Sequence, residues 1–473
     1  MFSSSRFSRA MHFFKDKDYF KQLLRLMLPI ALQNIFASAL NLVSVLMIGQ
    51  LGDAPVAAVG LANQVWFLLN IIVFGVVSGA SMFQAQFWGK RDIHNIRRVL
   101  GLSVKISAIV ALIFWAVAFF FPESVLRIYS SDPAVIEEGS QYLRTVSWSY
   151  WFYAITSAYS TAARATGNVR TPMLVSTSAL GMGVVLQYVF IFGFPPMGIE
   201  PGGVNGAAIG ILIARGFECV TFLLIIYLKR SSPIAANLRD LADANLGYFG
   251  RVMTPVLPVI INEVLWSFAI TTYNVIYGHI STQSVAAINI ASTVESLAWG
   301  IFLGVGNATS IMVGHLIGES KTDQAYRYAG RSLVVQALGG LGMGALIYLF
   351  GGTILQYYKV SPEVVDYARG ILTVMAIGWS MRAVNHVIII GVLRAGGDSR
   401  FSLFLDGIII WLVGVPLVAA AAFLLHLPIY YVYAFTMAEE AVKMIVGLWR
   451  YFSKRWINDL TIRVSPVTPK LES

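Results

Sequence analysis

The stretch LPVIINEVLW, from Leu257 to Trp266, has a counterpart earlier in the chain, LPIALQNIFA, from Leu28 to Ala37, at an offset of 229 in numbering. Both stretches are almost entirely apolar, and both carry a proline at the second position. Glu263 stands in the later stretch where Asn34 stands in the earlier one. A duplicated apolar segment with a carboxylate in one copy predicts both a repeated fold and a functional site.

Composition places the chain in the membrane. The 473 residues are 57% hydrophobic and only 12% charged, where a soluble chain has about 25% charged residues. Mean hydropathy is +0.69. Apolar runs of the length that crosses a bilayer as a helix, about 18 residues or more, recur along the sequence. Runs of this length exclude a transmembrane barrel, whose strands need only about 10 alternating residues.

We count twelve such spans, and the predicted fold class is therefore an all-α integral membrane protein. The spans lie near residues 26–49, 55–85, 100–121, 137–162, 171–193, 204–228, 252–278, 284–313, 331–350, 364–392, 401–424 and 429–449.

The repeat extends well beyond the opening stretch. Matching residues at the offset of 229 include Gly49 with Gly278, Gly75 with Gly304 and Gly89 with Gly318, whereas RATGNVR (164–170) matches RAGGDSR (394–400) at 230. The tenth span is expected to carry an insertion, paired with an omission elsewhere. Because six spans return the chain to its starting side, the halves are parallel repeats, as in transporters with a cleft between two bundles. We expect an N-lobe at residues 1–240 and a C-lobe at 241–473.

The formal charge of +10 is unevenly distributed. Alternate connections, starting with the N-terminal tail, hold 26 of the 34 Lys and Arg, whereas the other set holds only Arg127 and Lys359. This positive-inside pattern predicts a multi-pass membrane protein with both termini cytoplasmic. It explains the basic charge by contact with membrane lipids and makes a nucleic-acid partner unexpected.

Several other classes are disfavoured. Cys219 is the only cysteine, the six His lack metal-ligand spacing, and no phosphate-cradling glycine motif is present. The N-terminal segment has no small-residue cleavage site after an apolar core, so we expect the first span to be retained. We therefore expect neither an enzyme nor a cofactor.

Three acids lie inside predicted spans, and an ionisable residue at that depth is a functional hypothesis by default. At a helical rise of about 1.5 Å per residue, Glu263 and Glu295 fall near the middle of the bilayer, and Asp406 lies nearer the cytoplasmic interface. Their repeat partners are Asn34, Trp66 and Ser176, so none of the three acids recurs in the first half. Carboxylates confined to the second half predict a site there for Na⁺ or H⁺. A Na⁺ ion would be bound by Glu263, Glu295 and Asp406.

Neighbouring polar and aromatic residues complete this hypothesis. We expect Asn262, Tyr273 and Asn289 to add oxygen ligands to the cation site, and the substrate cavity to be lined by Asn34, Trp66, Trp266, Trp299 and Asn385. The alternative for each acid is a structural hydrogen bond to a neighbouring helix, above all for the shallower Asp406. The pairs Arg215 with Glu218 and Glu440 with Lys443 are spaced i,i+3 and are expected to neutralise each other locally.

The order of these features resembles the multidrug and toxic compound extrusion (MATE) family. The resemblance rests on the two parallel sets of six spans, RATGNVRTP and RAGGDSRF, GQLG at Gly49–Gly52, Pro258 followed by Asn262–Glu263, and SKRWINDLT near the C-terminus. It covers essentially the whole chain. It implies cation-coupled export of organic, often cationic, compounds by rocking of two lobes, with Glu263 matching the family's seventh-helix glutamate.

One branch of the family carries aspartates in the first and fifth helices, and this chain departs from it. The first position falls at Ser44 or Val45, and the fifth span contains no acid. We therefore expect cation coupling in the C-lobe. The predicted function is a monomeric antiporter that exports small organic, cationic or amphiphilic compounds in exchange for Na⁺ or H⁺. The alternative is a lipid-linked saccharide flippase of the same superfamily, whose cavity arginines would have to come from Arg144, Arg215 and Arg382.

Overall fold

A computed structural model describes residues 16–229, 231–243 and 246–464. In this part of the chain the regular structure is helical, apart from a single antiparallel bridge between Phe194 and Ile199. The helices of the first half are α2 (Lys17–Gly49), α3 (Asp53–Gly89), α4 (Ile93–Phe120), α5 (Pro122–Arg127), α6 (Pro133–Val146), α7 (Ser149–Ala165), α8 (Arg170–Phe192), the 3₁₀ turn η1 (Pro195–Met197), α9 (Gly203–Leu228) and α10 (Leu238–Ala242).

The second half repeats this order with longer irregular stretches. Its helices are α11 (Leu246–Ile280), α12 (Thr282–Gly318), α13 (Thr322–Leu355), α14 (Pro362–His386), η2 (Val387–Arg394), α15 (Ser399–Ser402), η3 (Leu403–Ile408), η4 (Ile410–Gly414), α16 (Val415–Ala419), η5 (Ala420–Leu424), α17 (Ile429–Phe452) and α18 (Leu460–Val464), where η2 to η5 are π-helical.

Ten helical stretches of the described residues are long and apolar enough to cross a membrane. The two other predicted spans differ for identifiable reasons. The fourth is divided into α6 and α7, of 14 and 17 residues, by a turn at Ser147 and Trp148. The twelfth, α17, is long enough but carries several charged side chains, Glu439, Glu440 and Lys443 among them.

The two halves share details of the backbone at matching positions. Arg91 and Ser320, which correspond at the offset of 229, both have a positive φ, at 62° and 61°. The helices that start at Pro133 and Pro362 each have a side-chain cap immediately before the proline, from Asp132 and Ser361. Proline is favoured at that position because its missing N–H would have no helical partner. Duplicated caps and turns confirm the parallel repeat.

The shift of the offset from 229 to 230 also has a structural counterpart. The α7 end and the η2 end close with the same bonds: Asn168 N donates to Ala163 O at 2.9 Å, and Asp398 N donates to Leu393 O at 2.8 Å. Gly167 and Gly397 supply the positive φ, 83° and 77°, that this type of helix end requires. Before the second of these ends, η2 is π-helical. A π-turn accommodates an extra residue in a helix, and such turns are frequent at functional sites.

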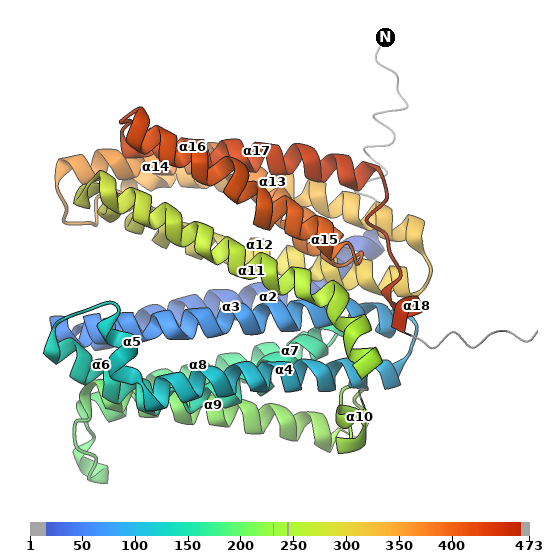
Figure 1. The fold of residues 1–473 in the computed structure, drawn as a ribbon, viewed down its shortest axis with the longest axis horizontal. Coiled ribbons are helices and arrows are strands. Elements are labelled where there is room, and N and C mark those ends of the chain that lie inside the picture. The colour runs from blue at the N-terminus through green and yellow to red at the C-terminus, as the bar shows by residue number, and fades with distance from the viewer. Residues whose placement is uncertain (1–15, 230, 244–245, 465–473) are drawn as a thin grey trace, which may run out of the picture. The chain divides into compact units, whose positions relative to one another are not determined.

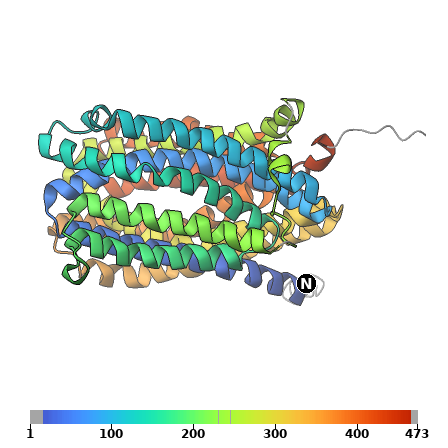
Figure 2. The same cartoon turned by 90° about the horizontal axis from the view of Figure 1, so that it is seen from below.

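The described helices form two compact units, each built from discontinuous segments. The N-terminal unit comprises Leu32–Gln84 and Arg91–Val256, and the described residues of the C-terminal unit fall within Met1–Ala31, Ala85–Lys90 and Leu257–Ser473. In the N-terminal unit α8 and α9 lie side by side (Figure 1 and Figure 2). In the C-terminal unit α13 packs on α14, and α14 packs on both α12 and α17.

The chain after α17 is fixed to the C-terminal unit by the fully buried Gln86. Its Nε2 donates to the carbonyls of Ala395 and Asn458 at 3.0 and 3.1 Å, and its Oε1 accepts from Leu460 N at 2.8 Å. Lys90 adds an ion pair to Asp459 at 2.9 Å.

Candidate functional site

The C-terminal unit contains a network of buried ionic groups, and Glu263 begins it. Its Oε1 lies 2.6 Å from Nη2 of Arg394, the last residue of η2. The arginine side chain is only 3% exposed, and the glutamate is 13% exposed. The motif RAGGDSR therefore supplies, through Arg394, the counter-charge of Glu263. Glu263 is the carboxylate that the second repeat has and the first lacks.

Asp406, on η3, forms the second part of the network. It accepts a hydrogen bond from Asn262 Nδ2 at 3.0 Å and pairs with Lys443 Nζ at 2.9 Å. Lys443 also contacts Glu439 one turn earlier on α17. Tyr273 donates to Glu439 at 2.6 Å. One buried lysine thus lies between two carboxylates that come from different helices.

Glu295, on α12, belongs to a neighbouring group. It pairs with Arg382 Nη1 at 2.6 Å and accepts from Trp299 Nε1 at 3.0 Å. Glu440 lies 3.9 Å from the same arginine and accepts from Asn385 Nδ2 at 2.7 Å. Arg382 therefore joins α12 to α17 through α14.

The network contains more acids than bases. Its acids are Glu263, Glu295, Asp406, Glu439 and Glu440, and its bases are Arg382, Arg394 and Lys443. With every group ionised the excess is two negative charges, which is costly to maintain in a low-dielectric interior. In addition, Asn262 Oδ1 and Asn385 Oδ1 are buried and have no hydrogen-bond partner among the described residues. Excess carboxylates beside unpartnered oxygens suit a bound monovalent cation or protons.

The structure brings some predicted site residues together and separates others. Glu263, Asp406, Asn262 and Tyr273 lie in the first two parts of the network, and Glu295, Trp299 and Asn385 lie in the third. Asn289 and Trp266 are exposed on α12 and α11. In the described part of the chain, no three His, Cys, Asp or Glu side chains form a metal-holding group. Glu263, Asp406 and Glu295 are thus each held by a base, and their cation-binding role stays a prediction.

Of the two ion pairs predicted from i,i+3 spacing, one is present in the structure. Arg215 and Glu218 do pair, at 2.8 Å. The pairing of Glu440 with Lys443 is wrong, because Lys443 contacts Asp406 and Glu439, and Glu440 contacts Asn385 and Arg382. Lys443 thus pairs with one carboxylate of another helix, Asp406, and with the carboxylate one turn earlier on its own helix, Glu439.

Three bases and two acids of the network were missed as site residues: Arg382, Arg394, Lys443, Glu439 and Glu440. The available signal was the cluster of charges in the apolar sequence of α17, where Glu439 and Lys443 lie one helical turn apart. The partners on other helices are a tertiary feature that spacing does not reveal.

The N-terminal unit contains a cavity of about 500 Å³ between α2, α3, α6, α7, α8 and α9. Its lining includes Trp66, Tyr150, Gln187, Arg215 and Glu218. Of the residues predicted to line the substrate cavity, Trp66 is found here. Asn34 also belongs to this unit but is not among the lining residues.

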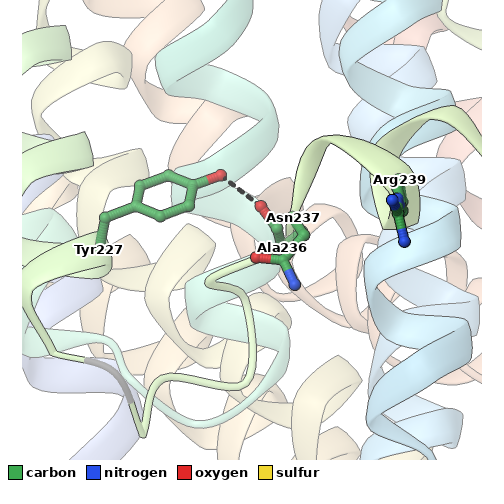
Figure 3. A pocket seen from close by; sticks show the side chains of 4 residues that line it. All are labelled: Tyr227, Ala236, Asn237 and Arg239. Atoms are coloured by element: carbon green, nitrogen blue, oxygen red, sulfur yellow. Dashed lines mark hydrogen bonds between the residues drawn. The ribbon is translucent and has the colours of Figure 1, made fainter.

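A further pocket of about 570 Å³ lies beside the polar segment between the two halves, at the end of α9 (Figure 3). The hydroxyl of Tyr227 donates to the carbonyl of Ala236 at 2.8 Å, and Asn237 and Arg239 complete the lining. Tyr227, Asn237 and Arg239 are all exposed, so this pocket has the character of a solvated surface rather than of a membrane-embedded site.

Comparison with known proteins identifies the class to which this architecture belongs. The MatE family model matches residues 29–189 and 258–420, two regions whose starting positions differ by the repeat offset of 229. The chain belongs to this family, the MATE transporters, and is a multi-pass membrane protein of the multidrug efflux type. The predicted family and the predicted twelve-helix fold are confirmed.

Individual relatives are distant but match over most of their length. The uncharacterized transporter YisQ of Bacillus subtilis is 25% identical over 418 residues, covering 87% of this chain and 90% of the relative. The probable multidrug resistance protein NorM of Pasteurella multocida is 24% identical, with 84% and 85% covered. The crystal structure of a mutant of the Vibrio cholerae MATE transporter VcmN has the same fold, with a TM-score of 0.85, 18% identity, and 94% and 99% covered.

Proposed function

We propose that the chain is a secondary antiporter that exports small organic, amphiphilic compounds, cationic ones included, in exchange for Na⁺ or H⁺. The observation that supports this best is the excess of two acids in the buried network of the C-terminal unit. A site with two negative charges in excess binds a cation whenever the unit can admit one, and releases it when the geometry of the pairs changes.

Coupling needs no direct contact between the two ligands. The cation would favour one orientation of the N-lobe (1–240) and C-lobe (241–473), and the organic substrate would favour the other. Each ligand shifts that equilibrium only by the difference of its affinities for the two states. We further propose that the protein works as a monomer in the bacterial inner membrane, with both termini in the cytoplasm and basic loops against anionic lipids.

Glu263 is the acid on which the proposal depends most, because it is partly exposed while its partner Arg394 is almost fully buried. A cation that enters from the exposed side therefore meets the carboxylate before it meets the arginine. Asp406 is also more exposed than its base: the side chain of Asp406 is 14% exposed and that of Lys443 is 3% exposed. Asn262, whose Nδ2 is bonded to Asp406, is the nearest source of a further oxygen ligand.

The test is uptake of a fluorescent cationic dye into inverted vesicles, driven separately by a Na⁺ gradient and a pH gradient. Glu263→Gln keeps an acceptor for Arg394 and removes one negative charge, so we expect gradient-driven uptake to be lost while the protein remains in the membrane. Glu319→Gln removes an acid from a surface pair with Lys321, 2.7 Å apart, and serves as the matched control. Full gradient-driven uptake by Glu263→Gln would refute the cation site.

The lipid-linked saccharide flippase considered from the sequence is not favoured. Arg144 lies near Glu123 on a short helix, Arg215 is bonded to Glu218, and Arg382 is bonded within the acid network of the C-terminal unit. Arg144 and Arg215 line separate pockets of the N-terminal unit, and Arg382 belongs to the C-terminal unit, whereas a flippase cavity needs several arginines that face one anionic ligand.

A further inference from the structure

The cavity of the N-terminal unit has two charged lining residues, and they differ sharply in access. Glu218 is 5% exposed and both of its oxygens are bonded, one to Ser176 Oγ at 2.5 Å and the other to Arg215 Nη1 at 2.8 Å. Arg215 is 26% exposed. A ligand in the cavity therefore meets the positive end of this pair.

Arg215 has donors to spare. A guanidinium carries five N–H donors in a planar fork, and among the described residues the bond to Glu218 is the one that Arg215 is seen to make. Its remaining donors suit a planar anion, because a carboxylate can accept two parallel hydrogen bonds from one guanidinium.

The guanidinium of Arg215 itself makes cation–π contacts with two neighbouring aromatic rings. The guanidinium carbon lies 5.5 Å from the ring centre of Trp66 and 5.6 Å from that of Tyr153. A second cation brought to the same rings would be repelled by Arg215, so these rings do not form a cage for a cationic ligand. Of the two rings, Trp66 lines the cavity, and its apolar surface can pack against a neutral aromatic ring.

Two further polar groups at the cavity are unsatisfied. The hydroxyl of Tyr150 and Oε1 of Gln187 have no hydrogen-bond partner among the described residues, although both side chains are at least nine-tenths buried. A buried polar atom without a partner carries a desolvation cost that a ligand can remove. Tyr150 offers a donor to an anionic oxygen, and Gln187 offers an acceptor to an N–H group.

We propose that Arg215 is a specificity-determining residue that binds the carboxylate of aromatic substrates. The cavity then favours aromatic compounds that carry a carboxylate, including zwitterions whose amino group lies away from Arg215, over matched compounds that lack the carboxylate. This inference rests on the proposed export function, for which it names a substrate class.

The test measures binding of a matched pair of probes to the purified full-length protein in lipid nanodiscs by titration calorimetry. The probes are naphthalene carboxylate and naphthalene carboxamide, which share a ring and a size and differ in charge. Wild type is expected to bind the carboxylate more tightly than the carboxamide. Arg215→Gln is expected to weaken the carboxylate about tenfold or more, since hydrogen bonds to charged groups are among the strong ones, and to leave the carboxamide affinity unchanged.

Two further variants control for effects on folding. Arg127→Gln removes an exposed arginine outside the cavity and reports any general effect of lost charge. The double variant Arg215→Gln with Glu218→Gln removes both members of the pair, so that no buried carboxylate is left alone, and should give the same selective loss.

Unchanged carboxylate binding in Arg215→Gln, equal weakening of both probes, or wild-type protein that does not prefer the carboxylate would each overturn the proposal. The measurement uses no ion gradient. Failure of this inference therefore leaves cation-driven efflux untouched, and failure of cation-driven efflux leaves a positive binding result standing.

Discussion

Lys443 is the base whose removal should disturb the acid network most. Its side chain is 3% exposed, it lies 2.9 Å from Asp406, and it contacts Glu439 on its own helix. Lys443→Met keeps an unbranched side chain of similar length, like the methylene chain of lysine, but removes the positive charge. The excess negative charge of the network then rises from two to three. The carboxylates of Asp406 and Glu439 lose the base that lies between them.

The size of the effect follows from the burial of the pair. Removing one partner of a buried ion pair costs about 3–5 kcal/mol, because the remaining charge is left uncompensated. Replacing both partners by groups of similar volume is often nearly neutral. We therefore expect Lys443→Met to lower thermal stability markedly, and the double variant Lys443→Met with Glu439→Gln to recover part of that loss, since Asp406 still lacks its base.

The assay is the temperature at which detergent-solubilised protein leaves the monodisperse peak after heating, measured at one heating rate because such unfolding is irreversible. Adding Na⁺ in place of choline should raise this temperature more in Lys443→Met than in wild type, since a ligand that binds the folded state stabilises it. A single variant as stable as wild type, or a double variant less stable than the single one, would refute the reasoning.

Two further predictions concern the ends of helices. Burial alone would raise the pKa of Asp459, but hydrogen bonds from Thr461 and Lys90 outweigh it and hold the pKa below its usual value. A lowered folded-state pKa contributes stability above the unfolded value of about 3.9, and this contribution is lost as pH falls through the folded value. Asp459→Asn should therefore lower the melting temperature at neutral pH, with a smaller difference in acid; an equal difference at both pH values would contradict this. Gly167→Ala should destabilise by about 1–2 kcal/mol because its φ is +83° although nothing crowds a methyl group there, whereas Gly181→Ala, equally uncrowded inside α8, should be neutral or stabilising by up to about 1 kcal/mol. In the same melting assay Gly167→Ala should lose stability and Gly181→Ala should not, and an equal loss in both would count against the strained-turn account.

Most of the fold was predictable because bilayer-length apolar runs have few alternatives. Several glycines and prolines recur at matching positions in the two halves, and some of them lie at the turns. RATGNVR and RAGGDSR, for example, end their helices with the same left-handed glycine and the same backbone bonds. A helix end of this kind depends on a few consecutive residues, so it can be predicted from a single sequence.

The departures come from tertiary contacts. The break between α6 and α7 lies in a run that is apolar enough to be taken as one helix, and no proline or glycine marks it. The π-helical turns of η2 to η5 follow no residue pattern, and the sequence indicated an insertion in the tenth span without showing that a π-turn would accommodate it.

The acids of the site were predictable and their bases were not. Glu263 and Asp406 stand out in the sequence because a carboxylate in a span is expensive. Arg394 is visible there only as part of a repeated loop, and Lys443 only as a local partner of Glu440. The pairs that matter join Glu263 to Arg394 and Asp406 to Lys443, each across different helices, and spacing along one helix carries no information about them.

The central claim is that the acid network of the C-terminal unit takes up a monovalent cation to balance its excess negative charge. The most direct measurement is cation uptake by the purified protein, with radioactive Na⁺ binding and proton uptake from choline buffer determined on wild type beside Glu263→Gln. The account predicts that wild type binds a cation near neutral pH, as saturable Na⁺ or as protons that Na⁺ displaces, and that Glu263→Gln binds less. Wild type and variant that take up the same amounts of both cations would contradict it.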